Sequence, residues 1–286
     1  MTNMKELIFI YLFKKLSIYL YSCFVSTICR DKIVRIGMFE IFDKQDKKAE
    51  EGSLLSLYDS LLIHDLNNIL QNIRTSSELS DRYIDNPKLN YKLKELIETI
   101  KQQATRGFRL LSNINKLSQL ESSQLDIYEI DVCDLLRKAI GYVKTPLQNN
   151  VTFKIDTPFN EYFINANELL QDVFENILVN AVIHNGNSLI EISISASEII
   201  QGKKRYLQLA ISDNGVGIED ARKKIIFDGK KIKVNNGKGL GIGLFLVKKL
   251  MGIYKGKIRV EDRVKGDYSQ GSNFILLFPK PKRRKT

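Results

Sequence analysis

Apolar residues recur with helical spacing in two consecutive stretches of the chain. Between residues 53 and 83 they are separated by steps of seven, four, three and four positions, with Asp59 as the one polar exception. Five residues form this heptad-like seam: Leu55, Leu62, Leu66, Ile69 and Ile73. The segment Asp85-Asn86-Pro87 interrupts the pattern, which resumes over residues 88–122. The sequence therefore predicts an antiparallel helical hairpin. Because two such helices cannot bury both apolar stripes alone, we expect two copies to form a four-helix bundle.

After Asp126 the spacing changes to short alternating runs mixed with helical ones. Strands are expected over residues 151–155, 190–196, 206–212, 257–260 and 273–278. Helices are expected over residues 132–143, 167–184 and 241–251. This order is typical of an α+β domain in which a sheet is layered with helices. Upstream, residues 32–43 predict one more strand, either isolated or the last strand of a sensor domain.

The length of 286 residues suggests two domains, and a hydrophobic content of 43% allows a sizeable core. The predicted division has four parts: an apolar segment and linker over 1–52, the hairpin over 53–124, the mixed domain over 125–279 and a basic tail over 280–286. The three cysteines are sparse and odd in number, which indicates a reducing compartment and a cytoplasmic location.

The net charge of +11 raises the question of a nucleic-acid partner. Outside the tail, however, the basic residues are scattered through the predicted helices and loops. A short basic tail is more often a solvated end than a binding arm, so no specific nucleic acid is expected. A basic surface also suits an acidic partner or a polyphosphate ligand.

The first thirty residues are largely apolar, but Lys14 and Lys15 divide them. Neither half reaches the roughly 18–20 uninterrupted apolar residues of a spanning helix. No small-residue cleavage site stands out, so a signal peptide is not expected. Three alternatives remain open for residues 1–30: a buried helix, an interfacial helix, and a membrane anchor containing the lysine pair.

His64 is one of only two histidines in the chain. With Leu66 at heptad position a, His64 occupies position f, the outermost place on the predicted helix. An imidazole there contributes little to packing. It is presented to solvent beside the carboxylate of Asp65, where it could act as a nucleophile.

Asn176 and Asn180 are spaced one helical turn apart within the predicted helix 167–184, on the same face as Asp172 and His184. Amide side chains at this spacing can donate to phosphate oxygens, and their carbonyl oxygens can join a hydrated Mg²⁺ site. The alternative is an ordinary solvated helix face.

Two glycine-containing segments follow. In Asp213-Asn214-Gly215-Val216-Gly217 a predicted strand ends in a carboxylate that could accept a hydrogen bond from an exocyclic amine. Residues 237–243 place glycines at every second position before a predicted helix, which exposes backbone N–H groups suited to polyphosphate. The basic stretch 230–238 before it resembles a mobile lid. Each segment taken alone is also compatible with a simple turn.

Taken in order, these motifs resemble those of the sensor histidine kinases of two-component signal transduction. The H box is His64–Asn68, the N box 176–181, the G1 box Asp213–Gly217, the F box Ile226-Phe227 and the G2 box Gly237–Gly243. The resemblance covers residues 53–279. It implies a dimeric hairpin that carries the phosphoacceptor, followed by a Bergerat-fold ATP-binding domain built as an α/β sandwich.

The resemblance also implies roles for individual residues. His64 would accept the phosphoryl group, and Asp65 would orient or deprotonate the His64 imidazole. Asn68 would position water for dephosphorylation of a response regulator. Asn180 would bind Mg²⁺, assisted by Asn176. The remaining residues expected to bind or shape the ATP site are His184, Asp213, Gly215, Gly217, Lys238, Gly239, Leu240, Gly241 and Gly243.

Two features of the motifs refine this expectation. Gyrase- and chaperone-type ATPases have a glutamate base where this chain has Asn176. Because an amide cannot act as that base, water is poorly activated in this chain, and ATP is kept for transfer to His64. The H box lacks the proline common in relatives, which predicts a smaller kink after His64. The expected partner is a response-regulator receiver domain. The alternative functions are a regulator phosphatase and an inactive dimeric ATP-binding scaffold.

Overall fold

The computed structural model describes residues 54–122, 125–144, 150–156, 162–227 and 241–280, with side chains in the first helix described from Asp65 onward. Tyr58–Thr286 forms one compact unit, and Met1–Leu57 is a separate one. The expected strand over 32–43 and the apolar residues 1–30 lie outside the described residues. In the part of the chain that is described, no helix is both long and apolar enough to cross a bilayer.

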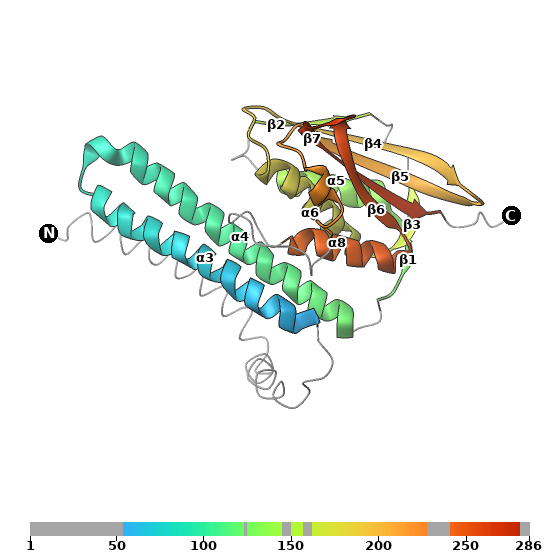
Figure 1. Ribbon diagram of the computed structural model, residues 1–286, viewed down its shortest axis with the longest axis horizontal. Coiled ribbons are helices and arrows are strands. Elements are labelled where there is room, and N and C mark those ends of the chain that lie inside the picture. Colours follow the sequence, from blue (N-terminus) through green and yellow to red (C-terminus); the bar gives the residue numbers. More distant parts are fainter. Residues whose placement is uncertain (1–53, 123–124, 145–149, 157–161, 228–240, 281–286) are drawn as a thin grey trace. The chain divides into compact units, whose positions relative to one another are not determined.

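The predicted helical hairpin is confirmed. Helix α3 (Leu54–Tyr83) and helix α4 (Asn90–Ser122) lie side by side in opposite directions (Figure 1). They are joined by a short 3₁₀ helix, η2 (Pro87–Leu89). Its first turn is capped by the Asn86 side chain, which accepts a hydrogen bond from the Lys88 N–H at 3.1 Å. Proline at the first helical position gives up no hydrogen bond there, which explains why the break falls at this point.

The rest of the described chain is a sheet layered with helices, as the α+β pattern predicts. Five strands pair in the order β2-β4-β5-β7-β6, parallel between β2 and β4 and antiparallel elsewhere. Their bounds are β2 (Val151–Ile155), β4 (Ile190–Gln201), β5 (Lys204–Asp213), β6 (Lys257–Val264) and β7 (Asp267–Pro279). A separate antiparallel pair consists of β1 (Tyr128–Asp131) and β3 (Phe163–Ala166).

Helices α5 (Val132–Val143), α6 (Leu170–Ile183) and α8 (Ile242–Ile253) lie on one side of the five-stranded sheet (Figure 1). The alternation along β4 explains this layering, because Ile190, Ile192 and Ile194 are all buried while the residues between them are not. The helices meet these strands in one large apolar core that includes Phe174 and Leu246. The layered arrangement therefore follows from the burial of a single sheet face.

Several boundaries differ from those expected. Strand β4 continues to Gln201 and β5 begins at Lys204, because the outer part of this hairpin is largely exposed and is held by backbone pairing without apolar alternation. Helix α6 begins at Leu170 because Asn167 forms a turn in which its side-chain oxygen accepts from the Leu169 N–H. Strands β1 and β3 and the short helix α7 (Asp220–Lys223) are absent from the sequence-based expectation, since each spans only four residues.

Candidate functional site

The H box lies in the N-terminal half of α3. The backbone of His64 is helical, and its side chain is outside the described set. Asp65 is almost completely buried, and its Oδ2 accepts a hydrogen bond from Arg106 Nη2 of α4 at 3.1 Å. Asn68 follows His64 by one turn and is half-buried. The carboxylate beside the expected nucleophile is thus held between the two helices of the hairpin.

The N-box asparagines have different environments, although they share one face of α6. Asn176 is buried: its amide donates to the Asp172 carbonyl at 2.8 Å, and its Oδ1 accepts from Asn113 Nδ2 of α4 at 3.2 Å. Asn180 is half-exposed, and its side chain makes no hydrogen bond with the described residues. The alternative of a fully solvated face is therefore wrong for Asn176, while the Asn180 amide is available for a ligand.

Lys116 of α4 forms an ion pair with Asp172, one turn before Asn176 on α6. This carboxylate was expected on the same face as the asparagines, and the structure places it there. Because a lysine already neutralises Asp172, its charge is satisfied within the protein. Asp172 is therefore a poor candidate for a metal ligand, and the hard oxygen that suits Mg²⁺ on this face is the carbonyl of the Asn180 side chain.

Asp213 is the last residue of β5, and it is buried. Its Oδ1 accepts hydrogen bonds from the Gly215 N–H at 2.8 Å and from the Ser272 N–H at 3.4 Å. Burial raises the pKa of this carboxyl, and the two backbone hydrogen bonds oppose that rise. Both bonds use the same oxygen, so Oδ2 keeps acceptor capacity for a donor such as an exocyclic amine.

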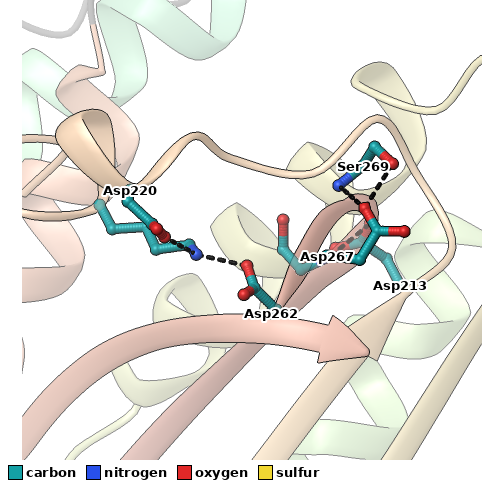
Figure 2. Close-up of polar contacts among 7 residues, drawn as sticks. Asp213, Asp220, Asp262, Asp267 and Ser269 are labelled. Carbon is teal, nitrogen blue, oxygen red and sulfur yellow. Dashed lines mark hydrogen bonds and ion pairs between the residues drawn. The ribbon is translucent and has the colours of Figure 1, made fainter. Parts of the chain in front are cut away.

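The turn after Asp213 depends on a glycine conformation. Gly217 has φ +68°, and a Cβ at this position would lie 1.6 Å from the Tyr268 carbonyl oxygen of β7. Nearby, Lys223 of α7 lies between Asp220 and Asp262, and the Ser269 hydroxyl donates to Asp267 (Figure 2). The turn is therefore fixed against β7, and the following α7 is tied to β6.

Asn214 organises the other side of the same turn. Its Oδ1 accepts from Asn185 Nδ2 at 2.8 Å and from the Glu191 N–H at 2.9 Å, while its Nδ2 donates to the Leu189 carbonyl at 2.9 Å. One amide thereby joins the end of β5 to the segment between α6 and β4. This network keeps the Asp213 carboxylate in place relative to α6.

The N, G1 and G2 motifs converge, although up to 67 residues separate Asn176 from Gly243. The Val216 N–H donates to the His184 carbonyl at the C-terminus of α6, at 3.2 Å. A Cβ on Gly243, at the start of α8, would lie 2.4 Å from Asn176 Oδ1. The structure thus gathers Asn176, Gly243 and the turn after Asp213 around α6.

The F-box residue Phe227 is buried and packs edge-on against Phe274 of β7, with ring centroids 6.3 Å apart. Gly241 has φ +63° and directly precedes α8. Lys238, Gly239 and Leu240, together with the basic stretch 230–238 expected to form a lid, lie outside the described residues. The role of those residues in binding nucleotide stays a prediction.

Three residues of this site were missed in the sequence: Arg106, Asn113 and Asn214. The first two contact Asp65 and Asn176 from α4, and no spacing along the chain reveals which side chain of one helix meets which residue elsewhere. Asn214 lies inside the G1 segment, but its amide network depends on residues just before β4 and at its start, where the sequence showed no motif.

Comparisons with known proteins agree with this fold. Residues 165–282 match the family described as histidine kinase-, DNA gyrase B- and HSP90-like ATPases. The histidine-protein kinase/phosphatase MprB of Mycolicibacterium paratuberculosis is 25% identical over 228 residues, covering 76% of this chain and 41% of MprB. The adaptive-response sensory kinase SasA of Gloeothece citriformis is 25% identical over 261 residues, covering 87% of this chain and 64% of SasA. The chain thus spans 41% and 64% of the length of these two relatives.

Solved structures show the same fold. The histidine kinase ThkA in complex with the response regulator TrrA superimposes with a TM-score of 0.57 at 20% identity, covering 89% of this chain and 70% of that chain. The Acinetobacter baumannii histidine kinase AdeS gives a TM-score of 0.54 at 16% identity, covering 77% of this chain and 98% of that chain.

The fold and the converging motifs define a GHKL-type ATP-binding domain, which is the class that the family match identifies. The hairpin that precedes this domain is present, and named relatives of the chain are histidine kinases. Residues 165–282 therefore form an ATP-binding domain of that family, and the chain is similar over most of its length to sensor histidine kinases.

Proposed function

We propose that the chain is an ATP-dependent protein-histidine kinase that phosphorylates His64 and passes the phosphoryl group to an aspartate of a response regulator. The observation that carries this proposal is the convergence of Asn176, the turn after Asp213 and Gly243 around α6. A buried carboxylate for adenine and an N box without an acidic base together suit an ATPase fold that transfers phosphate and does not hydrolyse ATP.

In the proposed reaction, the unprotonated ring nitrogen of His64 forms a bond to the γ-phosphorus of ATP. The bond from that phosphorus to the β–γ bridging oxygen breaks, and ADP leaves with the electron pair. The proton on the other ring nitrogen passes to Asp65. A carboxylate oxygen of the regulator then attacks the phosphorus, the P–N bond breaks, and Asp65 returns its proton to the imidazole.

The ATP site takes its residues from both glycine motifs and from α6. Asp213 reads the adenine amine, and Asn176 and His184 line the α6 side. The glycine segments shape the pocket through Gly215, Gly217, Lys238, Gly239, Leu240, Gly241 and Gly243. The half-exposed amide of Asn180 would hold a Mg²⁺ ion through its carbonyl oxygen, the kind of hard ligand that this ion prefers. Such an ion neutralises phosphate charge when bound.

The hairpin pairs with a second copy of the chain. Apolar side chains on the described part of α3 and α4 remain exposed, among them Leu70, Phe108 and Leu111. Covering such a surface in a four-helix bundle removes apolar area from water. On this proposal residues 53–124 are the dimerisation and phosphotransfer domain and residues 125–279 the ATP-binding domain.

Incubation with radiolabelled ATP and Mg²⁺ tests the kinase. Label that is stable to base and labile to acid is expected on the wild-type chain. The His64→Gln variant should take up less than about one hundredth as much, because no other side chain replaces the nucleophile. Equal labelling of wild type and variant contradicts the proposal. Binding of ATP without any labelling favours the inactive scaffold.

A second function, dephosphorylation of the regulator, is supported by the position of Asn68. It lies one turn after His64 and three residues after Asp65, and MprB is named a kinase/phosphatase. An amide there can hold a water molecule in line with a phosphoaspartate. In Asn68→Ala, regulator dephosphorylation should fall about tenfold or more while autophosphorylation persists. An unchanged dephosphorylation rate removes this function.

A further inference from the structure

Asp65 is a charged group in an unusual place. Its side chain is 3% exposed, although it lies next to a residue expected to face solvent. A buried carboxylate is costly unless a cation and hydrogen bonds compensate it. Arg106 supplies both from the facing helix, and its own side chain is 26% exposed. This ion pair crosses the hairpin at the level of the H box.

The contact between the two residues uses only one carboxylate oxygen. Arg106 Nη2 binds Asp65 Oδ2 at 3.1 Å. Asp65 Oδ1 is buried, and no donor within the described residues reaches it. An orphaned buried acceptor is uncommon, since leaving it unpaired costs free energy. The carboxylate therefore has one oxygen fixed by a cation and one oxygen ready to accept a proton or a hydrogen bond.

Proton transfer from His64 to Asp65 needs a fixed carboxylate. Adjacent residues on an α-helix project about 100° apart, so their side chains meet only in particular rotamers. A free aspartate samples several χ1 wells, most of which point its oxygens away from its neighbour. The Arg106 contact limits that sampling.

We infer that Arg106 is a positioning residue for phosphorylation: it holds Asp65 Oδ2 so that Oδ1 receives the proton that His64 releases. This inference rests on the proposed kinase function. Arg106 acts through Asp65 and is assigned no bond to ATP or to the phosphoryl group. The assignment differs from a simple structural ion pair because it predicts coupling between Arg106 and Asp65 in the rate of phosphorylation.

Substitution by methionine removes the charge and all donors of Arg106 while keeping a long side chain suited to a helix. Lys101→Met is the matched control, because Lys101 is an exposed cation of α4 that pairs with Glu98. Arg106→Lys keeps the charge. Since the observed contact uses a single nitrogen, lysine should restore most of the function.

The experiment measures autophosphorylation of the full chain across a range of ATP concentrations. Arg106→Met should lower the maximal rate about tenfold and leave the KM for ATP unchanged, a loss smaller than the roughly 10²–10⁴-fold of a general base itself because Asp65 is still present. Arg106→Lys and Lys101→Met should stay within about threefold of wild type. In the Asp65→Asn background, Arg106→Met should cause no additional loss, because the group through which it acts is gone.

The inference is overturned by a wild-type rate in Arg106→Met, a faster rate, a tenfold loss in Lys101→Met, or an undiminished loss in the Asp65→Asn background. A faster rate would mean that Arg106 restrains Asp65. Circular dichroism and ATP affinity check folding, and if Arg106→Met does not fold, a folded Arg106→Lys with a tenfold lower rate overturns the inference. Absence of label on His64 in the wild type contradicts the proposed function itself.

Discussion

The hairpin and the ATP-binding domain bury their apolar residues very differently. The ATP-binding domain has a continuous core in which residues such as Phe174, Ile192 and Leu246 are fully enclosed. The described part of the hairpin buries Ile69 and Leu110, while Phe108, two residues before Leu110 on the same helix, stays 58% exposed. One region encloses its apolar residues within a single chain, and the other leaves large apolar side chains exposed, which the proposed pairing with a second copy would cover.

The two regions also hold their buried carboxylates differently. Asp213 is compensated by backbone N–H groups of Gly215 and Ser272, which the fold of the sheet fixes in place. Asp65 is compensated by one long side chain, Arg106. Backbone donors cannot turn away, whereas an arginine can change rotamer. The Asp213 carboxylate is therefore held by the backbone of the sheet, whereas the position of the Asp65 carboxylate depends on one side chain of the facing helix.

Glycine substitution in the ATP-binding domain should have the largest effect. Gly217→Ala forces a Cβ to 1.6 Å from the Tyr268 carbonyl at a positive φ, so unfolding free energy should fall by about 3 kcal/mol or more. Gly202→Ala is the control, since it has φ +60° with open space and should cost only about 1–2 kcal/mol. Urea denaturation measures both. Equal losses of unfolding free energy in the two variants would show that the backbone around Gly217 moves to accommodate the added methyl group.

A lysine introduced on the exposed apolar face of the hairpin should weaken the proposed dimer. Burying a leucine side chain contributes about 1.5–3 kcal/mol, so Leu70→Lys should raise the dimer dissociation constant about tenfold or more. Ile200→Lys, at an even more exposed apolar position on β4, should leave association unchanged. Analytical ultracentrifugation compares the two variants. A monomeric wild type, or a loss only in Ile200→Lys, would contradict the partnered hairpin.

Removing the charge of Asp213 should weaken ATP binding about tenfold, equivalent to about 1.4 kcal/mol. Two donors face this side chain, the Gly215 N–H and the amine of adenine. A carboxylate offers an oxygen to each of them, whereas the amide of Asp213→Asn offers one oxygen and one NH₂ group. Asp267→Asn is the neighbouring control, because its carboxylate bonds to residues two and three positions further along the chain, Ser269 and Gln270, of which Ser269 is labelled in Figure 2. Isothermal titration calorimetry should separate them, and equal affinities would remove Asp213 from adenine recognition.

The smallest effect is expected at Gly107, in the interior of α4. An added Cβ would lie 3.5 Å from Ile69 Cγ2, an ordinary contact. Alanine is the better helix former, so Gly107→Ala should raise the unfolding free energy by about 0.5–1 kcal/mol. Gly141→Ala in α5 has open space and serves as the reference. If thermal unfolding shows that Gly107→Ala lowers the stability while Gly141→Ala does not, α3 and α4 are packed too closely at Ile69 to accept the added methyl group.

The sequence predicted those elements whose residues alternate or recur around a buried face. Helices α3, α4 and α5 and strand β2 lie within one or two residues of the expected ranges, because an apolar period requires many positions to agree. The outer half of the β4–β5 hairpin and the short strands β1 and β3 were missed, since backbone pairing holds them and leaves no apolar period.

For the candidate site, the motifs predicted which segments matter but not how their side chains are used. Asn176 and Asn180 look equivalent in sequence, yet the first is buried against Asn113 and the second is half-exposed. Arg106 carries no motif, and its contact with Asp65 depends on the register between two helices. Such pairings arise from tertiary packing, which a period along one chain does not specify.

The central claim is that His64 receives the γ-phosphoryl group. Mass-spectrometric mapping of peptides from the chain after incubation with ATP and Mg²⁺, kept above neutral pH to preserve phosphohistidine, tests it most directly. Fragmentation should place the added phosphate on His64 in the segment Leu61–Leu70. Phosphate found on His184, on a serine or threonine, or on no residue of an ATP-binding preparation would contradict the account.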